Sequence, residues 1–294
     1  MLARYSATFM AMTMMSVESI TVELFFIMTR IPTIIVGVIS TPIAGTILLI
    51  VYRMIMGKEI TILRSWKILL IIGGSFAFTL LTWFDAVGHI GAGKTALINI
   101  PLETVIIVTL SWIFLSERLH KIQIIGAVVV ISGVTLSVTS DVSNNNITQF
   151  GIGEIEAIVT SFTSGFETVI ITKLLLRYNA LEVSAFTLII SGLVLNVSWF
   201  FIIGSSEINI YALLYLFIIA PLIPIILTIS SYTSLKRIGA SLSTIIWSCS
   251  IILTVVISLV ITYFGVPFTI PENITVALIG GIMSVVGIGV IFKK

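Results

Sequence analysis

Residues 33–52 read TIIVGVISTPIAGTILLIVY, a run of 20 residues without a charged side chain. With a rise of about 1.5 Å per residue, a helix of this length crosses about 30 Å, the thickness of the hydrocarbon core of a bilayer. An apolar run of about 10–14 residues would fit a buried helix of a soluble protein, but this run is longer. The stretch therefore predicts a transmembrane helix.

The composition of the whole chain also indicates a membrane protein. Of 294 residues, 58% are hydrophobic and 10% are charged, whereas soluble domains carry about 25% charged residues. A formal net charge of +2 without a basic cluster gives no indication of a nucleic-acid partner. Cys249 is the only cysteine, and two histidines, His89 and His120, leave little material for a His-based metal site. We therefore expect a lipid bilayer as the main partner, no nucleic acid, no cofactor and no bound metal.

The rest of the chain divides into apolar runs of spanning length when it is broken at charges, prolines and Asn/Gly clusters. The ten segments are 6–29, 33–52, 67–87, 93–115, 122–140, 152–173, 183–204, 210–232, 239–263 and 274–292. If the N-terminus is cytoplasmic, 13 of the 15 Lys and Arg residues lie on the inner side, and only Arg30 and Lys94 lie outside. Cytoplasmic loops of membrane proteins hold most of the cations. We therefore predict an all-α polytopic protein of the cell membrane, with ten spans and both termini cytoplasmic.

The two halves of the chain resemble each other. Ile90-Gly91-Ala92 recurs 148 residues later as Ile238-Gly239-Ala240, each time just before a new span. Because five spans per half is an odd number, a duplicated half would have to sit inverted in the membrane. Inverted repeats place a substrate site near the midplane, between the halves. The predicted repeats are residues 1–145 and 146–294.

Particular motifs extend this similarity to a known family. The stretch Tyr232–Ala240 (YTSLKRIGA) resembles a signature of the drug/metabolite transporter superfamily, especially of its EamA-like branch. In the first half, a family-like pattern comprises Phe84-Asp-Ala86, Pro101, Leu115-Ser-Glu117-Arg-Leu119, Gln123, Gly126 and Gly133. The first two segments match poorly, and Cys249, Ser234 and Gly265-Val266 depart from the usual residues of the family. The resemblance implies an exporter or exchanger of amino acids, other metabolites, sugar phosphates or drugs.

Carboxyl groups inside the predicted spans are the first candidates for a functional site. A charge at the bilayer centre costs at least about 2.5–3.5 kcal/mol, so such residues usually face a cavity or a partner. Glu18 and Glu103 lie nearest the midplane, and Glu23 lies about 140° around the helix from Glu18, so both cannot line one cavity equally. Asn99 shares a helical face with Glu103, and Glu167 belongs to a polar stripe of the sixth segment. The stripe comprises Glu156, Thr160, Thr163, Ser164 and Glu167.

Two roles are open for these polar residues. Glu18, Glu103, Glu167 and Asn99 are predicted to bind the substrate, and Glu18 or Glu103 to exchange protons with it, because burial favours a protonated carboxyl. The Ser and Thr residues around them can instead hold helices together.

Three more side chains complete the candidates. Trp83 and Trp247 are placed to stack on a substrate, and Lys94 either attracts an anionic substrate from outside or anchors its helix at the headgroups.

One motif points to a different chemistry. Residues 88–95 (GHIGAGKT) fit the pattern G-x-x-x-x-G-K-[ST] of nucleotide-binding loops. Such a loop requires a preceding strand and a soluble sheet, and neither is predicted here. No catalytic constellation is found elsewhere. We therefore expect no enzyme, but a secondary transporter, either an exporter or an exchanger, that moves a small metabolite such as an amino acid by alternating access, with coupling to protons as one option. The alternatives are a sugar-phosphate or nucleotide-sugar antiporter, a membrane-embedded enzyme and a channel.

Overall fold

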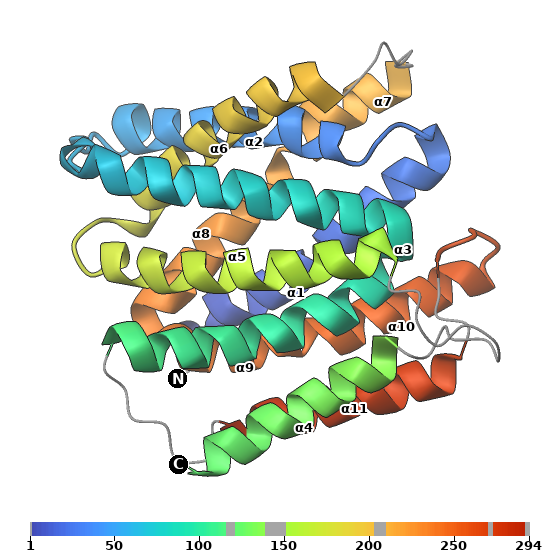
Figure 1. Cartoon of the computed structure of the whole chain (residues 1–294). Helices are drawn as coiled ribbons and strands as arrows, with labels where there is room; N and C mark the ends of the chain where they lie inside the picture. Colours follow the sequence, from blue (N-terminus) through green and yellow to red (C-terminus); the bar gives the residue numbers. More distant parts are fainter. Residues whose placement is uncertain (1, 116–120, 139–150, 203–209, 270–272, 292–294) are drawn as a thin grey trace.

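The computed structural model describes residues 2–115, 121–138, 151–202, 210–269 and 273–291. Within these residues the regular structure is helical, without a strand (Figure 1). The helices are α1 (Leu2–Thr29), α2 (Ile34–Ile50), α3 (Trp66–Leu115), α4 (Lys121–Val138), α5 (Ile152–Leu175), α6 (Ala180–Ile202), α7 (Ile210–Leu214), α8 (Leu222–Ile238), α9 (Ala240–Ser248), α10 (Ser250–Tyr263) and α11 (Ile274–Ile291). A π-helical turn, Val51–Ile55, extends α2, and another, Tyr215–Ile219, joins α7 to α8.

The helices form a membrane-embedded bundle. Seven helices of the described residues are long and apolar enough to cross a membrane, judged by length and composition. Large apolar side chains cover the outside of the bundle; for example, Phe162, Leu193 and Val197 are 60%, 60% and 61% exposed. Such a surface is unfavourable in water and indicates contact with lipid. The prediction of an all-α, multi-pass membrane protein is therefore confirmed.

α3 is longer than either span predicted within it, because it contains two arms that join at Gly91. The backbone of Gly91 has φ 78° and ψ 163°, which lies outside the helical region and is strained for residues with a side chain. A Cβ at Gly91 would also lie 2.5 Å from the Cβ of Thr269. In Figure 1 the two arms run in opposite directions, and α5 lies between them. Gly239, between α8 and α9, has nearly the same backbone angles, φ 85° and ψ 166°.

Two predicted segments differ from the helices that the structure shows. The segment predicted at 210–232 continues as helix to Ile238, because only the positive φ of Gly239 ends it. The segment predicted at 239–263 is divided into α9 and α10 at Cys249. Charged residues near the interface, such as Lys236, do not end a helix, although they mark where the lipid ends.

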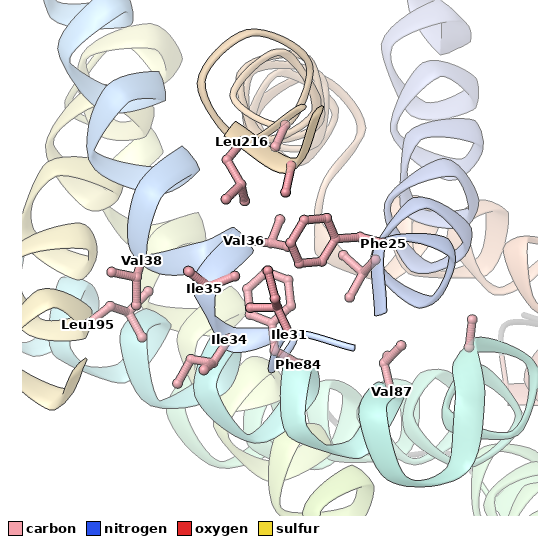
Figure 2. Packing of buried hydrophobic residues seen from close by; sticks show 14 of the residues in the cluster. Phe25, Ile31, Ile34, Ile35, Val36, Val38, Phe84, Val87, Leu195 and Leu216 are labelled. Carbon is pink, nitrogen blue, oxygen red and sulfur yellow. The ribbon is translucent and has the colours of Figure 1, made fainter. Parts of the chain in front are cut away.

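A cluster of buried apolar side chains joins the end of α1 to the start of α2 and to the first arm of α3. Figure 2 shows Phe25 and Phe84 pointing into the same space beside Val36, with Leu216 above them. Phe25 also stacks on Tyr215, with ring centroids 5.2 Å apart. Phe84 and Val36 line the interior cavity described below. This cluster therefore forms the wall at one end of that cavity.

α4 and α11 pack closely against each other at the edge of the bundle, where glycines let the backbones approach (Figure 1). A Cβ on Gly287 of α11 would lie 2.8 Å from the backbone nitrogen of Val130 and 2.9 Å from the carbonyl oxygen of Gly126. A Cβ on Gly289, two residues further along α11, would meet nothing within 4 Å. Contact through small residues is a common way for helices to associate in lipid.

We expect Gly287→Ala to destabilise the protein by about 1–3 kcal/mol, the usual cost of overpacking a tight interface. The matched control is Gly289→Ala, which gains the helix propensity of alanine, about 1 kcal/mol over glycine, without a clash. Thermal unfolding of both variants in detergent measures the difference. Equal melting temperatures for the two variants would show that α4 and α11 do not pack as described.

Candidate functional site

The bundle encloses a cavity of about 180 Å³. Its lining comes from α1, α2, both arms of α3, α5, the Tyr215–Ile219 turn, α8 and α9. The volume is below the range of about 300–1,000 Å³ that holds drug-sized ligands, and therefore fits a small metabolite. Both halves of the chain contribute to its walls, so a solute inside would contact residues that are distant in sequence.

Three carboxyl groups line the cavity from three different helices. Glu18 comes from α1, Glu103 from the second arm of α3, and Glu167 from α5. Glu103 and Glu167 are close enough to interact electrostatically. No Lys, Arg or His is found among the described residues of the lining. The cavity is therefore electronegative whenever its carboxyls are ionised.

Aromatic side chains form another part of the wall. Trp83 of α3 and Trp247 of α9 line the cavity together with Tyr215 and Tyr232. Flat aromatic faces attract cations by their quadrupole, and they bury apolar parts of a solute. Asn99 lies one helical turn before Glu103 and lines the same wall. The structure thus brings six of the seven predicted residues to one cavity.

Several polar atoms of this wall are buried without a hydrogen-bond partner. They are Thr79 Oγ1, Glu167 Oε2, Ser231 Oγ, Tyr232 OH and Trp247 Nε1, all of them in residues that line the cavity. A buried polar group without a partner costs about 1–3 kcal/mol. Five such groups around one cavity indicate that a bound molecule or water supplies the missing hydrogen bonds.

Lys94 is the predicted residue that does not line the cavity. It is buried, with 5% of its surface exposed, and its Nζ lies 2.5 Å from Glu154 Oε1 at the start of α5. Neither predicted role, capture of an anion or anchoring at the headgroups, fits this buried ion pair. The predicted stripe of the sixth segment also divides: Thr160, Ser164 and Glu167 line the cavity, whereas Thr163 and Glu156 do not.

Two further glutamates are buried for structural reasons. Glu23 accepts the backbone N–H of Ala92, at the start of the second arm of α3, and that of Thr269, both at 2.7 Å. Glu182 accepts the N–H groups of Thr61 and Ile62 at 2.5 and 2.8 Å. A carboxylate that accepts hydrogen bonds from the unpaired backbone N–H groups near the start of a helix is in a favourable position. Each of these glutamates joins an element of one half of the chain to a backbone segment of the other half.

Tyr215, Tyr232 and Ser231 were not among the predicted site residues. Tyr232 belongs to the family-like motif, but a motif does not show which way a side chain points. Tyr215 lies in a π-helical turn, where the helical periodicity that predicts a face is interrupted. No sequence signal identifies Ser231 among the many serines of the chain.

Carboxyl groups that face a cavity inside an apolar helix bundle are typical of substrate and ion pathways in membrane proteins. The family comparison agrees: residues 4–139 match the model of the EamA-like transporter family, which is part of the drug/metabolite transporter superfamily. The predicted resemblance is thus confirmed, and the matched region includes the first two segments, where it had been expected to be poor. The family that this model describes consists of transporters rather than enzymes.

No curated protein matches the chain. A solved crystal structure is similar to it over 98% of this chain and 96% of the other, with a TM-score of 0.70 and 18% sequence identity. At this identity, the likeness concerns the fold alone.

Proposed function

We propose that the protein is a secondary transporter of a small solute that carries an ammonium group, with an amino acid as the best fit. The observation that carries this proposal is the lining of the cavity: Glu18, Glu103 and Glu167 without a described Lys, Arg or His. Carboxylates and aromatic faces bind an ammonium group. The partnerless donors Tyr232 OH and Trp247 Nε1 are available for the carboxylate of a zwitterion.

The same lining argues against the other substrates that the sequence leaves open. A sugar phosphate or a nucleotide sugar carries two or more negative charges, and proteins bind such groups with Arg, Lys or helix N-termini. Three carboxyls in the described wall would repel them. The size of the cavity, about 180 Å³, also favours a single small metabolite.

We further propose ten spans in two inverted repeats, residues 1–145 and 146–294. Several observations support this division. The stretch Ile62–Phe114 counts as two spans because it turns at Gly91, and the apolar helices Ile124–Leu136 and Ile274–Val290 add two more. Gly91 and Gly239, at equivalent places of the two repeats, share an unusual backbone conformation. α2 packs on α6, and α4 packs on α11. In both pairs, a helix of one repeat contacts its counterpart in the other repeat.

A cytoplasmic location of both termini belongs to the same proposal. In Figure 1 the start of α1 and the end of α11 lie on the side where α2 joins α3 and α5 joins α6. The α2–α3 connection carries Arg53, Lys58 and Arg64. Cation-rich connections remain on the cytoplasmic side. The cell membrane is the proposed location.

The test is a thermal-shift screen of the purified protein in detergent against amino acids, simple amines, sugar phosphates and nucleobases. A ligand at 100 times its Kd stabilises the folded state by about 2.7 kcal/mol. We expect amino acids or amines to raise the melting temperature and sugar phosphates to leave it unchanged. The opposite ranking would overturn the proposed substrate class, and the deamino analogue of any hit is the matched control for the ammonium group.

A further inference from the structure

Three side chains of the kind that bind metals lie together outside the cavity, where the first arm of α3 meets the start of α5. Asp85 and His89 are one helical turn apart on α3, and Glu156 comes from α5. One ligand atom of each lies within 4.8 Å of those of the other two. His89 Nδ1 is 3.0 Å from Glu156 Oε2. Asp85 and His89 are exposed, and none of the three residues lines the cavity.

We propose that Asp85, His89 and Glu156 form a binding site for a divalent transition-metal ion, and that Zn²⁺ fits it best. Zinc is bound by imidazole nitrogen and by Asp or Glu oxygen, and a site with three protein ligands keeps the fourth position for water. Zinc bonds of about 2.0–2.2 Å place neighbouring ligand atoms about 3.3–3.6 Å apart in a tetrahedron. The observed separations, up to 4.8 Å, require only small rotations of side chains that are partly exposed.

An ion pair between His89 and Glu156 explains only part of this arrangement. The Asp85 carboxyl also lies beside the Glu156 carboxyl, within 4.8 Å, and two ionised carboxylates at such a distance repel each other. A protonated imidazole balances one negative charge, whereas a divalent ion balances both and binds the imidazole in its neutral form. Lys94, further along α3, is paired with Glu154.

The ligand types also predict which metals bind. Mg²⁺ and Ca²⁺ prefer sites made of oxygen ligands, and Mg²⁺ gives up its water reluctantly. Imidazole nitrogen favours Zn²⁺ and other later transition metals. We therefore expect binding of Zn²⁺ and, more weakly, of Mn²⁺, with little effect of Mg²⁺ or Ca²⁺ at the same concentration.

A metal at this place would fasten two helices that also form the cavity wall. Three residues before Asp85, Thr82 forms a hydrogen bond of 2.7 Å with Thr160, which lies one turn after Glu156 and lines the cavity. The ion would therefore hold α3 and α5 together beside the solute. If they separate during transport, Zn²⁺ slows it. This consequence rests on the proposed function, whereas the binding itself does not.

The experiment uses the full chain, purified without a histidine tag, treated with EDTA and then titrated with ZnCl₂ or MgCl₂. We expect Zn²⁺ to raise the melting temperature with saturation at one ion per chain, and Mg²⁺ to have no such effect. Loss of a residue that only hydrogen-bonds to a metal ligand weakens metal binding by roughly 10–100-fold. His89→Ala removes a ligand itself and should therefore weaken Zn²⁺ binding by more than this. Asp85→Asn, which keeps an oxygen ligand and the size of the side chain, should have an intermediate effect.

The matched controls are His120→Ala and Cys249→Ser, which remove the other histidine and the only cysteine. Both should bind Zn²⁺ like the unaltered protein. The proposal is overturned if Zn²⁺ causes no shift, if the shift survives His89→Ala, or if Mg²⁺ causes an equal shift. Zn²⁺ binding in a protein that transports no amine would leave the metal site standing and overturn the transport proposal alone.

Discussion

Replacing Glu103 by Gln is expected to weaken binding of an amine or amino acid by about 10- to 100-fold, because a hydrogen bond to a charged group contributes about 1.5–3 kcal/mol. Glu103 lines the cavity, and its neighbour Glu167 would be left with Glu18 to hold the ammonium group. The glutamine keeps the size of the side chain, so a loss of binding reports the charge. Titration of the purified variant with the solute that gives the largest thermal shift measures the effect.

The matched controls for this prediction come from a residue pair on α5. Ser164 lines the cavity and Thr163 does not, although both belong to the polar stripe of that helix. Thr163→Ala should therefore bind like the unaltered protein, while Ser164→Ala should bind less well. Glu103→Gln with unchanged affinity would show that the carboxyl does not contact the solute.

Proton exchange at Glu18 or Glu103, which the sequence predicts, is tested with glutamine variants of both residues. If Glu18 or Glu103 releases a proton when the solute binds, a pH gradient drives transport in the unaltered protein and fails to drive it in one of the variants Glu18→Gln and Glu103→Gln. Uptake that depends on the gradient to the same extent in both variants contradicts proton exchange at these residues. In that case the proposed solute and its binding site would remain, but these residues would not couple transport to protons.

The second large effect is expected from Glu23→Ala, which should destabilise the protein by about 2–5 kcal/mol. The substitution leaves the buried N–H group of Ala92 and the partly buried N–H group of Thr269 without an acceptor, and an unsatisfied buried group costs about 1–3 kcal/mol. Glu23 is 1% exposed, so water does not replace the lost carboxylate easily. Thermal unfolding in detergent measures the loss.

The control for Glu23 is Glu59→Ala, which removes an exposed carboxyl and should shift the melting temperature little. Glu23→Gln should fall between them, because an amide keeps one acceptor oxygen and brings an additional donor against the two amides. If Glu23→Ala and Glu59→Ala melt at the same temperature, Glu23 does not hold the start of the second arm of α3.

Much of the helical fold could be predicted from the sequence, because the bilayer leaves few alternatives. Each predicted span is helical over most of its described length, since an apolar run of about 20 residues has only one favourable conformation in lipid. The turn at Gly91 falls between the predicted segments 67–87 and 93–115. The end of α8 was not placed correctly, because a charge marks the edge of the lipid, whereas Gly239 marks the end of the helix.

The polar residues of the cavity were also predictable, because an intramembrane carboxyl must find a cavity or a partner. The sequence does not tell which of these two it finds. Glu18, Glu103 and Glu167 face the cavity, while Glu23 binds backbone amides 69 and 246 residues away. Lys94 pairs with a carboxylate that is 60 residues away. Such partners depend on helix packing, which a single sequence with short motifs does not specify.

Solute exchange across a membrane tests the central claim most directly. Liposomes that contain the purified protein are loaded with the unlabelled amino acid or amine that gives the largest thermal shift, and uptake of the labelled solute is followed. The account predicts saturable uptake that the internal solute accelerates, and that Glu103→Gln reduces at equal protein content. Uptake that equals that of protein-free liposomes, or that does not saturate, would contradict it.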